Sequence, residues 1–199
     1  MTSKLDHISL LDQTFFGLDT LAMLGDIEAF IEFSECNIAR QKYQEILRAE
    51  QECKDLKLDD PRQEIQYRAQ LLEGLEYRYE VSLKQRVRYS ALVMMITTIE
   101  WILLALKNRA AFDFPDTPKK KNVAVHTLSV FNEKATIGLE YEIQILESMI
   151  QIRNCITHAA GLLASYQYEL ELREKLAGFL GVSVSNLNFL GDSIEIESG

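Results

Sequence analysis

Apolar residues recur at every third or fourth position along most of this chain, which is the spacing of helices that bury one face. Residues 1–17 have this spacing and predict a short docking helix that ends at Gly17. Residues 19–58 and 62–108 predict the two longest helices, because Pro61 between them suits a first helical position. The pattern therefore predicts a chain dominated by long helices.

The stretch 91–106 is apolar nearly all round, as expected of a helix in the middle of a bundle. A membrane span is the alternative, but the stretch is shorter than the roughly 20 residues of a span and contains Glu100. We therefore expect a central helix that is covered on all sides. A buried carboxylate there needs a partner, because an unpaired charge is costly in an apolar setting. We expect that partner to be Arg153, the alternatives being an exposed rim or another basic residue.

Shorter elements follow this stretch. Residues 111–122 contain two prolines and three lysines and predict a loop. Residues 123–136 predict a short helix, and a further helix begins at Leu139 and keeps helical spacing to Gly178 or Gly181.

The C-terminal residues change pattern. Residues 194–196 alternate apolar and polar side chains and suggest a short strand, which needs pairing from a partner or from further chain. Together the elements predict an all-α bundle of four or more helices with a short irregular or β-like C-terminal tail. No linker divides the chain, so we expect a single domain over residues 1–199.

Composition agrees with this class. The chain is 47% hydrophobic and 26% charged with only three prolines in 199 residues, which is typical of one soluble, helix-rich domain. Its three cysteines are an odd number without metal-ligand spacing, and no signal peptide opens the sequence, so a reducing cytoplasm is expected. Glycine-rich phosphate loops, nucleophile elbows and zinc-protease motifs are missing from the sequence, so we expect no cofactor and no metal.

The charge argues against a broad basic surface for nucleic acid, because the formal net charge is −9. Local clusters soften this argument. Lys84, Arg86 and Arg88 form one candidate RNA-binding cluster, and the alternative is that they belong to solvated helix faces. The same alternatives hold for the lysines and arginine at positions 107, 109 and 119–121. His7 and His126 have no acidic or histidine partner at metal spacing and are interpreted as surface or capping histidines.

Candidate chemistry is concentrated in residues 150–161, where Arg153, Asn154 and His158 interrupt an apolar helical run. On a helix, His158 and Asn154 share a face opposite the apolar stripe, so Asn154 is placed to orient His158. The stripe itself contains Met149, Ile152, Ile156, Ala159, Leu163 and Tyr166. Arg153 and His158 are about 140° apart around a helix and roughly 7.5 Å apart along it. A helix break, a long reach of the arginine or a second copy of the chain is needed to bring them together.

The sequence Arg-Asn-x-x-x-His, within an apolar helix, resembles the arginine-x4-6-histidine motif of HEPN domains. The resemblance covers only this short segment. It implies an all-helical bundle and a metal-independent endoribonuclease of a toxin–antitoxin or defence system, in which the motifs of two protomers face each other. The implied partners are RNA, a second copy of the chain, and an antitoxin or other protein. The nucleotidylated tyrosine of some HEPN toxins has no counterpart, because Ala160 stands at its position.

An arginine and a histidine without metal ligands suit RNA cleavage by the neighbouring 2′-hydroxyl. Histidine can accept or donate a proton near neutral pH, and arginine matches phosphate oxygens with its planar donors. We expect His158 to move the proton, Arg153 to neutralise the developing charge, and Asn154 to fix His158 or a phosphate, with Glu100 in support. The alternative is a non-catalytic HEPN-like binding or dimerisation module, in which these side chains form a structural network. The acidic charge favours the module, and the outward face of His158 favours the enzyme.

Overall fold

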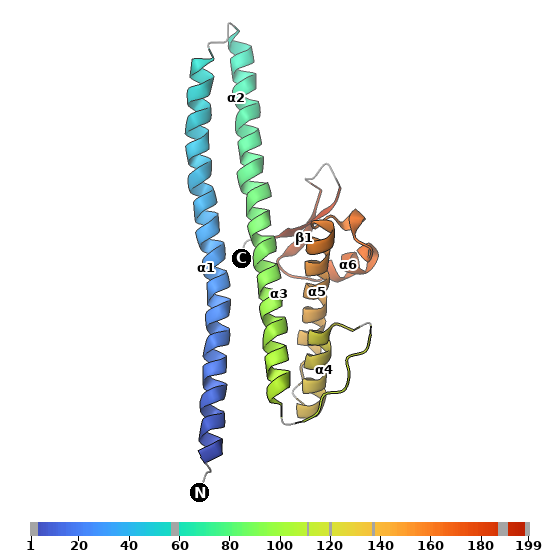
Figure 1. Ribbon diagram of the computed structural model, residues 1–199. Coiled ribbons are helices and arrows are strands. Elements are labelled where there is room, and N and C mark those ends of the chain that lie inside the picture. Colours follow the sequence, from blue (N-terminus) through green and yellow to red (C-terminus); the bar gives the residue numbers. More distant parts are fainter. Residues whose placement is uncertain are drawn as a thin grey trace. The chain divides into compact units, whose positions relative to one another are not determined.

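A computed structural model describes residues 4–56, 60–110, 112–119, 121–136, 138–186 and 191–197, with side chains from Gly17 onward. The chain is all-α with a short two-stranded tail, as the sequence pattern predicts (Figure 1). Its α-helices are α1 (Lys4–Asp55), α2 (Pro61–Glu76), α3 (Lys84–Arg109), α4 (Val123–Ala135), α5 (Glu140–Ala159) and α6 (Glu169–Leu176). A π-helical segment, η1 (Tyr77–Leu83), joins α2 to α3, and η2 (Leu163–Ser165) is a short 3₁₀ turn. The strands are β1 (Val182–Ser185) and β2 (Ser193–Ile196).

Helix α1 is longer than the sequence predicts, because it runs through Gly17 without a break. A glycine ends a helix when it adopts a left-handed conformation, and Gly17 is not among the residues with positive φ. Inside a helix a glycine costs only about 1 kcal/mol relative to alanine. The predicted separate docking helix over residues 1–17 is therefore wrong.

Two compact units make up the chain, and one of them is Glu28–Ala91. In it the second half of α1 and the helix α2 run side by side in opposite directions (Figure 1). Helix α2 begins as predicted, with Pro61 in its first turn and the Asp60 carboxylate accepting from the Arg62 backbone N–H at 2.9 Å. The helix predicted over residues 62–108 contains a π-helical segment, η1, where no glycine or proline signals it.

Ion pairs connect the two sides of this hairpin. Lys42 Nζ lies 2.7 Å from Glu76 and 2.8 Å from Glu80, and Arg68 lies 2.8 Å from Glu50. Because each pair joins α1 to the returning helix, the charged positions fix how the two helices align.

The other unit comprises Met1–Ile27 and Leu92–Gly199, and its core joins α3, α4 and α5. The buried cluster consists of Ile96, Leu103, Ala124, Val125, Leu146 and Ile150. Figure 1 shows α4 and α5 beside the second half of α3, in agreement with this cluster. Helix α5 enters the cluster through Leu146 and Ile150. Three residues of the predicted apolar stripe are also buried but lie outside this cluster, namely Ile152, Ile156 and Leu163.

The apolar stretch 91–106 is not covered on all sides, contrary to the prediction. Trp101 is 50% exposed and Leu104 is 41% exposed. The reason is that the α4 and α5 members of the core cluster cover one side of α3 rather than encircling it. By length and composition alone, the continuous helix Pro61–Arg109 is apolar enough to cross a membrane, a test that core helices of soluble bundles also pass.

The C-terminal tail pairs within its own chain. Strands β1 and β2 are antiparallel, with Val182 opposite Ile196. Strand β2 also docks beside the end of α5, where the Ile194 N–H donates to the Gly161 carbonyl at 2.9 Å. Ile194 is 1% exposed, so this edge of the tail belongs to the core. The pairing that the strand pattern required is thus supplied by the chain itself.

Candidate functional site

The buried stripe of α5 positions the candidate site. Ile152, Ile156 and Ala159 are 1%, 9% and 7% exposed, as the helical spacing predicts. Cys155 lies between them and is completely buried. This stripe fixes the rotation of α5 about its axis, and with it the directions of Arg153, Asn154 and His158.

Helix α5 ends at Ala159, which places His158 in its last turn. Ala160 and Gly161 both adopt left-handed conformations, and the Gly161 N–H donates to the Cys155 carbonyl at 3.1 Å. The sequence-based prediction that the helix continues to Gly178 or Gly181 is therefore wrong. The chain turns at Gly161, forms η2, and begins the separate helix α6.

Arg153 forms the predicted ion pair with Glu100. Its Nη2 lies 2.8 Å from Glu100 Oε1, and the two side chains are only 20% and 22% exposed. Arg153 Nε is buried and has no hydrogen-bond partner among the described residues. The Glu100 carboxylate on helix α3 therefore binds the guanidinium mainly through one of its nitrogens, Nη2.

Asn122 is a member of this group that the sequence analysis missed. Its Nδ2 donates at 3.2 Å to Glu100 Oε1, the same oxygen that accepts from Arg153. Its Oδ1 accepts from the backbone N–H groups of Ala124 and Val125 and so caps α4. An asparagine immediately before a predicted helix is a recognisable cap, but nothing in the sequence signals its contact with Glu100.

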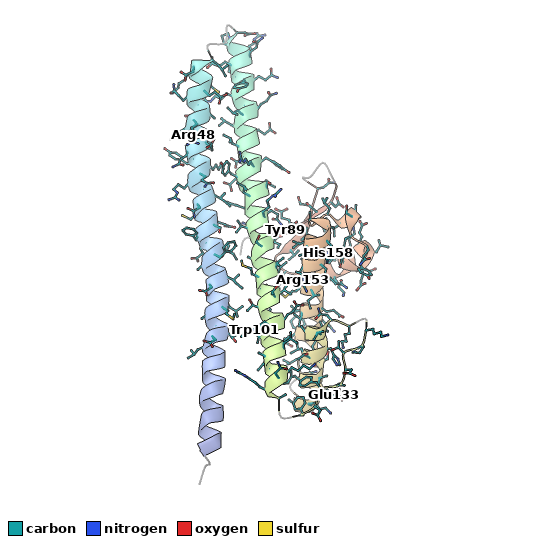
Figure 2. All side chains as sticks on the ribbon, in the orientation of Figure 1. Arg48, Tyr89, Trp101, Glu133, Arg153 and His158 are labelled. Carbon is teal, nitrogen blue, oxygen red and sulfur yellow. The ribbon has the colours of Figure 1, made fainter. Side chains whose placement is uncertain are left out.

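His158 is exposed, and Asn154 is half-buried. Figure 2 shows His158 nearer the end of α5 than Arg153. In the described part of the chain, no hydrogen bond joins the Asn154 side chain to His158. At this turn the Thr157 hydroxyl donates instead to backbone carbonyls, that of Arg153 at 2.9 Å and that of Asn154 at 3.3 Å. The expected orienting contact from Asn154 is thus not formed in this structure.

The geometry narrows how Arg153 and His158 can meet. Helix α5 is unbroken from Glu140 to Ala159, so a helix break between the two residues is not the means. Glu100 also holds the arginine against α3. The remaining means are extension of the arginine side chain beyond its helix or the approach of a second copy of the chain.

The candidate RNA-binding cluster lies in the other compact unit. Two of its three cations are engaged there: Lys84 lies 2.5 Å from Glu80, and Arg88 lies 2.9 Å from Glu35. Arg86 is exposed and lines an open groove of about 360 Å³ on the hairpin. Of these three cations, Arg86 is therefore the one that has no ion pair with a described carboxylate.

His126 was predicted to be a surface or a capping histidine, and the surface placement is wrong. It is 9% exposed, and its Nε2 lies 3.2 Å from the Pro115 carbonyl. The sequence spacing gave no sign of this contact, because it depends on how the loop before α4 folds back on the helix. The side chain of His7 lies outside the described residues. Within the described parts of the chain, no group of three or more histidine, cysteine, aspartate or glutamate side chains could hold a metal ion.

Comparisons with known proteins identify no relative of this chain. A scan against protein-family models matches no family, and searches of curated proteins and of solved structures find no match either. The resemblance of residues 150–161 to the HEPN motif therefore stands on those residues alone.

Proposed function

We propose that this protein is a metal-independent endoribonuclease of HEPN type, acting in the cytoplasm as part of a toxin–antitoxin or defence system. The observation that carries the proposal is a partly buried arginine, held 2.8 Å from a carboxylate, on the same helix as an exposed histidine in its last turn. The histidine can accept or donate a proton near neutral pH, and the arginine carries a permanent positive charge. It requires no metal ion.

The reaction follows from these groups. His158 accepts the proton of a ribose 2′-hydroxyl, whose oxygen attacks the adjacent phosphorus atom. The bond from phosphorus to the 5′-oxygen of the next nucleotide breaks, and that oxygen takes a proton from a histidinium. Arg153 stabilises the additional negative charge on the phosphate oxygens through Nη1, since Nη2 donates to Glu100 and Nε is buried. The products are a 2′,3′-cyclic phosphate and a 5′-hydroxyl. DNA is not cleaved, because it lacks the 2′-hydroxyl.

A two-fold homodimer supplies the complete site in this proposal. Arg153 and His158 point in different directions from an unbroken helix, so an isologous contact between two copies brings an arginine of one copy near a histidine of the other. RNA would bind weakly, because the chain has a net charge of −9, and the binding would be salt-sensitive, because it depends on contacts between arginine and phosphate.

The test is incubation of the purified protein with mixed cellular RNA in the presence of EDTA. Cleavage should occur with the wild type and be abolished in His158→Ala. Thr157→Ala is the matched control, since Thr157 is an exposed neighbour on α5 whose hydroxyl, within the described residues, hydrogen-bonds to backbone carbonyls of its own helix. Analysis of the product ends should show cyclic phosphates.

The alternative is the non-catalytic binding or dimerisation module. The observation that favours it is the structural use of Arg153, whose ion pair with Glu100 ties α5 to α3. Under this alternative, wild type and His158→Ala leave RNA equally intact, and both still bind a protein partner. Equal lack of cleavage in the presence of EDTA would therefore decide against the enzyme.

A further inference from the structure

One oxygen of Glu100 receives two hydrogen bonds. Arg153 Nη2 donates to Oε1 at 2.8 Å, and Asn122 Nδ2 donates to the same atom at 3.2 Å. The three side chains come from α5, from α3 and from the residue that begins α4. A charged pair that joins two helices is thus connected to the start of a third.

The orientation of the Asn122 amide is determined by its other contacts. Its oxygen accepts from the Ala124 N–H at 2.8 Å and from the Val125 N–H at 3.3 Å. An amide oxygen can accept from these N–H groups and the amide nitrogen cannot, so the nitrogen must face Glu100. Flipping the amide would lose the cap of α4 and place an oxygen against a carboxylate.

We propose that Asn122 is a positioning residue for Arg153, acting through Glu100. Asn122 restrains the carboxylate and occupies part of the acceptor capacity of Oε1. A carboxylate released from this restraint can rotate to take the guanidinium through two parallel hydrogen bonds, which is the geometry that arginine and carboxylate favour. Such a pair would use the donors of Arg153 that the proposed reaction needs for phosphate. The effect on catalysis rests on the proposed function, whereas the effect on the guanidinium does not.

Asn122→Ser isolates the contact with Glu100. Serine is a good helix cap, so it can keep the hydrogen bond to the start of α4, but its side chain is too short to bridge to the carboxylate. Asn122→Ala removes both contacts. The difference between the two variants reports the cap, and the difference between wild type and Asn122→Ser reports the bridge.

Asn132 provides a matched control near the other end of α4. Its amide is also used on both sides: Nδ2 donates to Glu140 at 2.9 Å, and Oδ1 accepts from the Gly138 and Leu139 N–H groups at 2.8 and 2.7 Å. It makes no contact with Glu100 or Arg153 among these bonds. Asn132→Ser therefore removes an equivalent bridge away from the guanidinium.

The experiment measures the ¹⁵N–¹H signal of the Arg153 guanidinium, assigned by its loss in Arg153→Lys, together with cleavage of an RNA oligonucleotide in EDTA. We expect Asn122→Ser to shift this signal and to lower kcat about tenfold, with KM changed less than about threefold. Asn132→Ser should leave both unchanged, and Asn122→Ala should add a loss of thermal stability. An Arg153 signal unchanged in Asn122→Ser, or shifted equally in Asn132→Ser, overturns the proposal. If the wild type cleaves no RNA, the proposed function fails and the Arg153 signal still decides the positioning role.

Discussion

Glu100 is a charged side chain in the most apolar stretch of the sequence, and Arg153 balances its charge. We expect Glu100→Gln to lower the free energy of unfolding by about 2 kcal/mol, because it leaves the arginine without its carboxylate. The figure lies below that for a completely buried pair, since each side chain keeps about one-fifth of its exposure. Urea unfolding followed by circular dichroism measures it.

A surface ion pair gives the control for this prediction. Arg48, paired with Glu45, has a side chain that is 73% exposed, so Arg48→Ala should cost under about 1 kcal/mol. If Glu100→Gln costs no more than Arg48→Ala, the pair between α3 and α5 contributes nothing beyond a surface contact.

The cysteines differ in their surroundings. Burial raises the pKa of the Cys155 thiol to about 11, and Cys53 is also buried, whereas Cys36 is exposed. Because the thiolate is the reactive form, we expect Cys36 alone to react rapidly with a thiol reagent at pH 8. All three should react after unfolding in denaturant. Rapid modification of Cys155 in the folded protein, detected by mass spectrometry, would contradict its buried placement.

A contact between side chains could be predicted from the sequence where one of the two residues is charged and lies in an apolar stretch. Glu100 in an apolar helix required a cation, and Arg153 was predicted from its position beside the buried stripe of its own helix. Asn122 was readable as a cap but not as a partner of Glu100, because that contact depends on where α4 begins in space. The orienting contact between Asn154 and His158 followed from helical spacing alone, which brings two side chains near each other without ensuring a hydrogen bond.

At the scale of the elements, the end of α5 depends on Gly161. Its φ is +81°, and its carbonyl accepts from the Ile194 N–H of the tail. Gly161→Ala should therefore destabilise the protein by about 1 kcal/mol, since an alanine is strained in this conformation. Gly178→Ala is the control, because Gly178 has no positive φ and open space where a Cβ would lie. Equal unfolding midpoints for the two variants in denaturant would show that the left-handed turn carries no strain.

The stability of the helical hairpin in the unit Glu28–Ala91 should depend on pH through Glu80. Its ion pairs with Lys42 and Lys84 hold its pKa below the ordinary value of 4.5. A carboxyl whose folded pKa is lowered contributes stability that is complete above its ordinary pKa and is lost as the pH falls through the folded value. Lys42→Met should therefore lower the melting temperature at pH 7, by about 2 °C, and have almost no effect at pH 3.

At alkaline pH the stability that the Lys42 ion pairs provide changes in the opposite direction, because Lys42 loses its charge as the pH rises. The hydrogen bonds with Glu76 and then Glu80 raise the pKa of Lys42 above 10.5. The stability that this shift provides is present below pH 10.5 and is lost as the pH rises through the folded pKa. Equal effects of Lys42→Met at pH 3 and pH 7 would show that the pairs do not stabilise the hairpin.

Glycines show why element boundaries were harder to predict than elements. The same residue type lies inside a helix at Gly17 and beyond the end of one at Gly161. Helical spacing continues past both positions in the sequence. What distinguishes Gly161 is the β2 strand that docks against it, a contact 33 residues away in the chain that local patterns do not report.

At the scale of the whole molecule, periodicity indicates how much surface a helix must bury but not what covers it. The stretch 91–106 was predicted to be enclosed, yet Trp101 and Leu104 remain about half exposed. The two compact units, Glu28–Ala91 and the remainder, were likewise not separated by any proline-rich or glycine-rich linker in the sequence. Their boundaries fall within α1 and α3, where helical spacing is uninterrupted.

The proposed homodimer makes its own prediction, because its catalytic pair is shared between copies. Arg153→Ala and His158→Ala should each abolish RNA cleavage when assayed alone. Mixed under conditions that exchange subunits, they should regain activity, since a hybrid dimer has one site with the arginine of one copy and the histidine of the other.

The expected recovery follows from random exchange of subunits. Half of the dimers are then hybrids, and each hybrid has one intact site of two, so the mixture should reach about a quarter of wild-type activity. Sedimentation analysis must first show that both variants remain dimeric. A mixture as inactive as its components, although hybrids are shown to form by mass spectrometry, would place the arginine and histidine of any active site on a single copy. That outcome would leave extension of the Arg153 side chain, released from Glu100, as the only means by which the two residues meet on an unbroken helix.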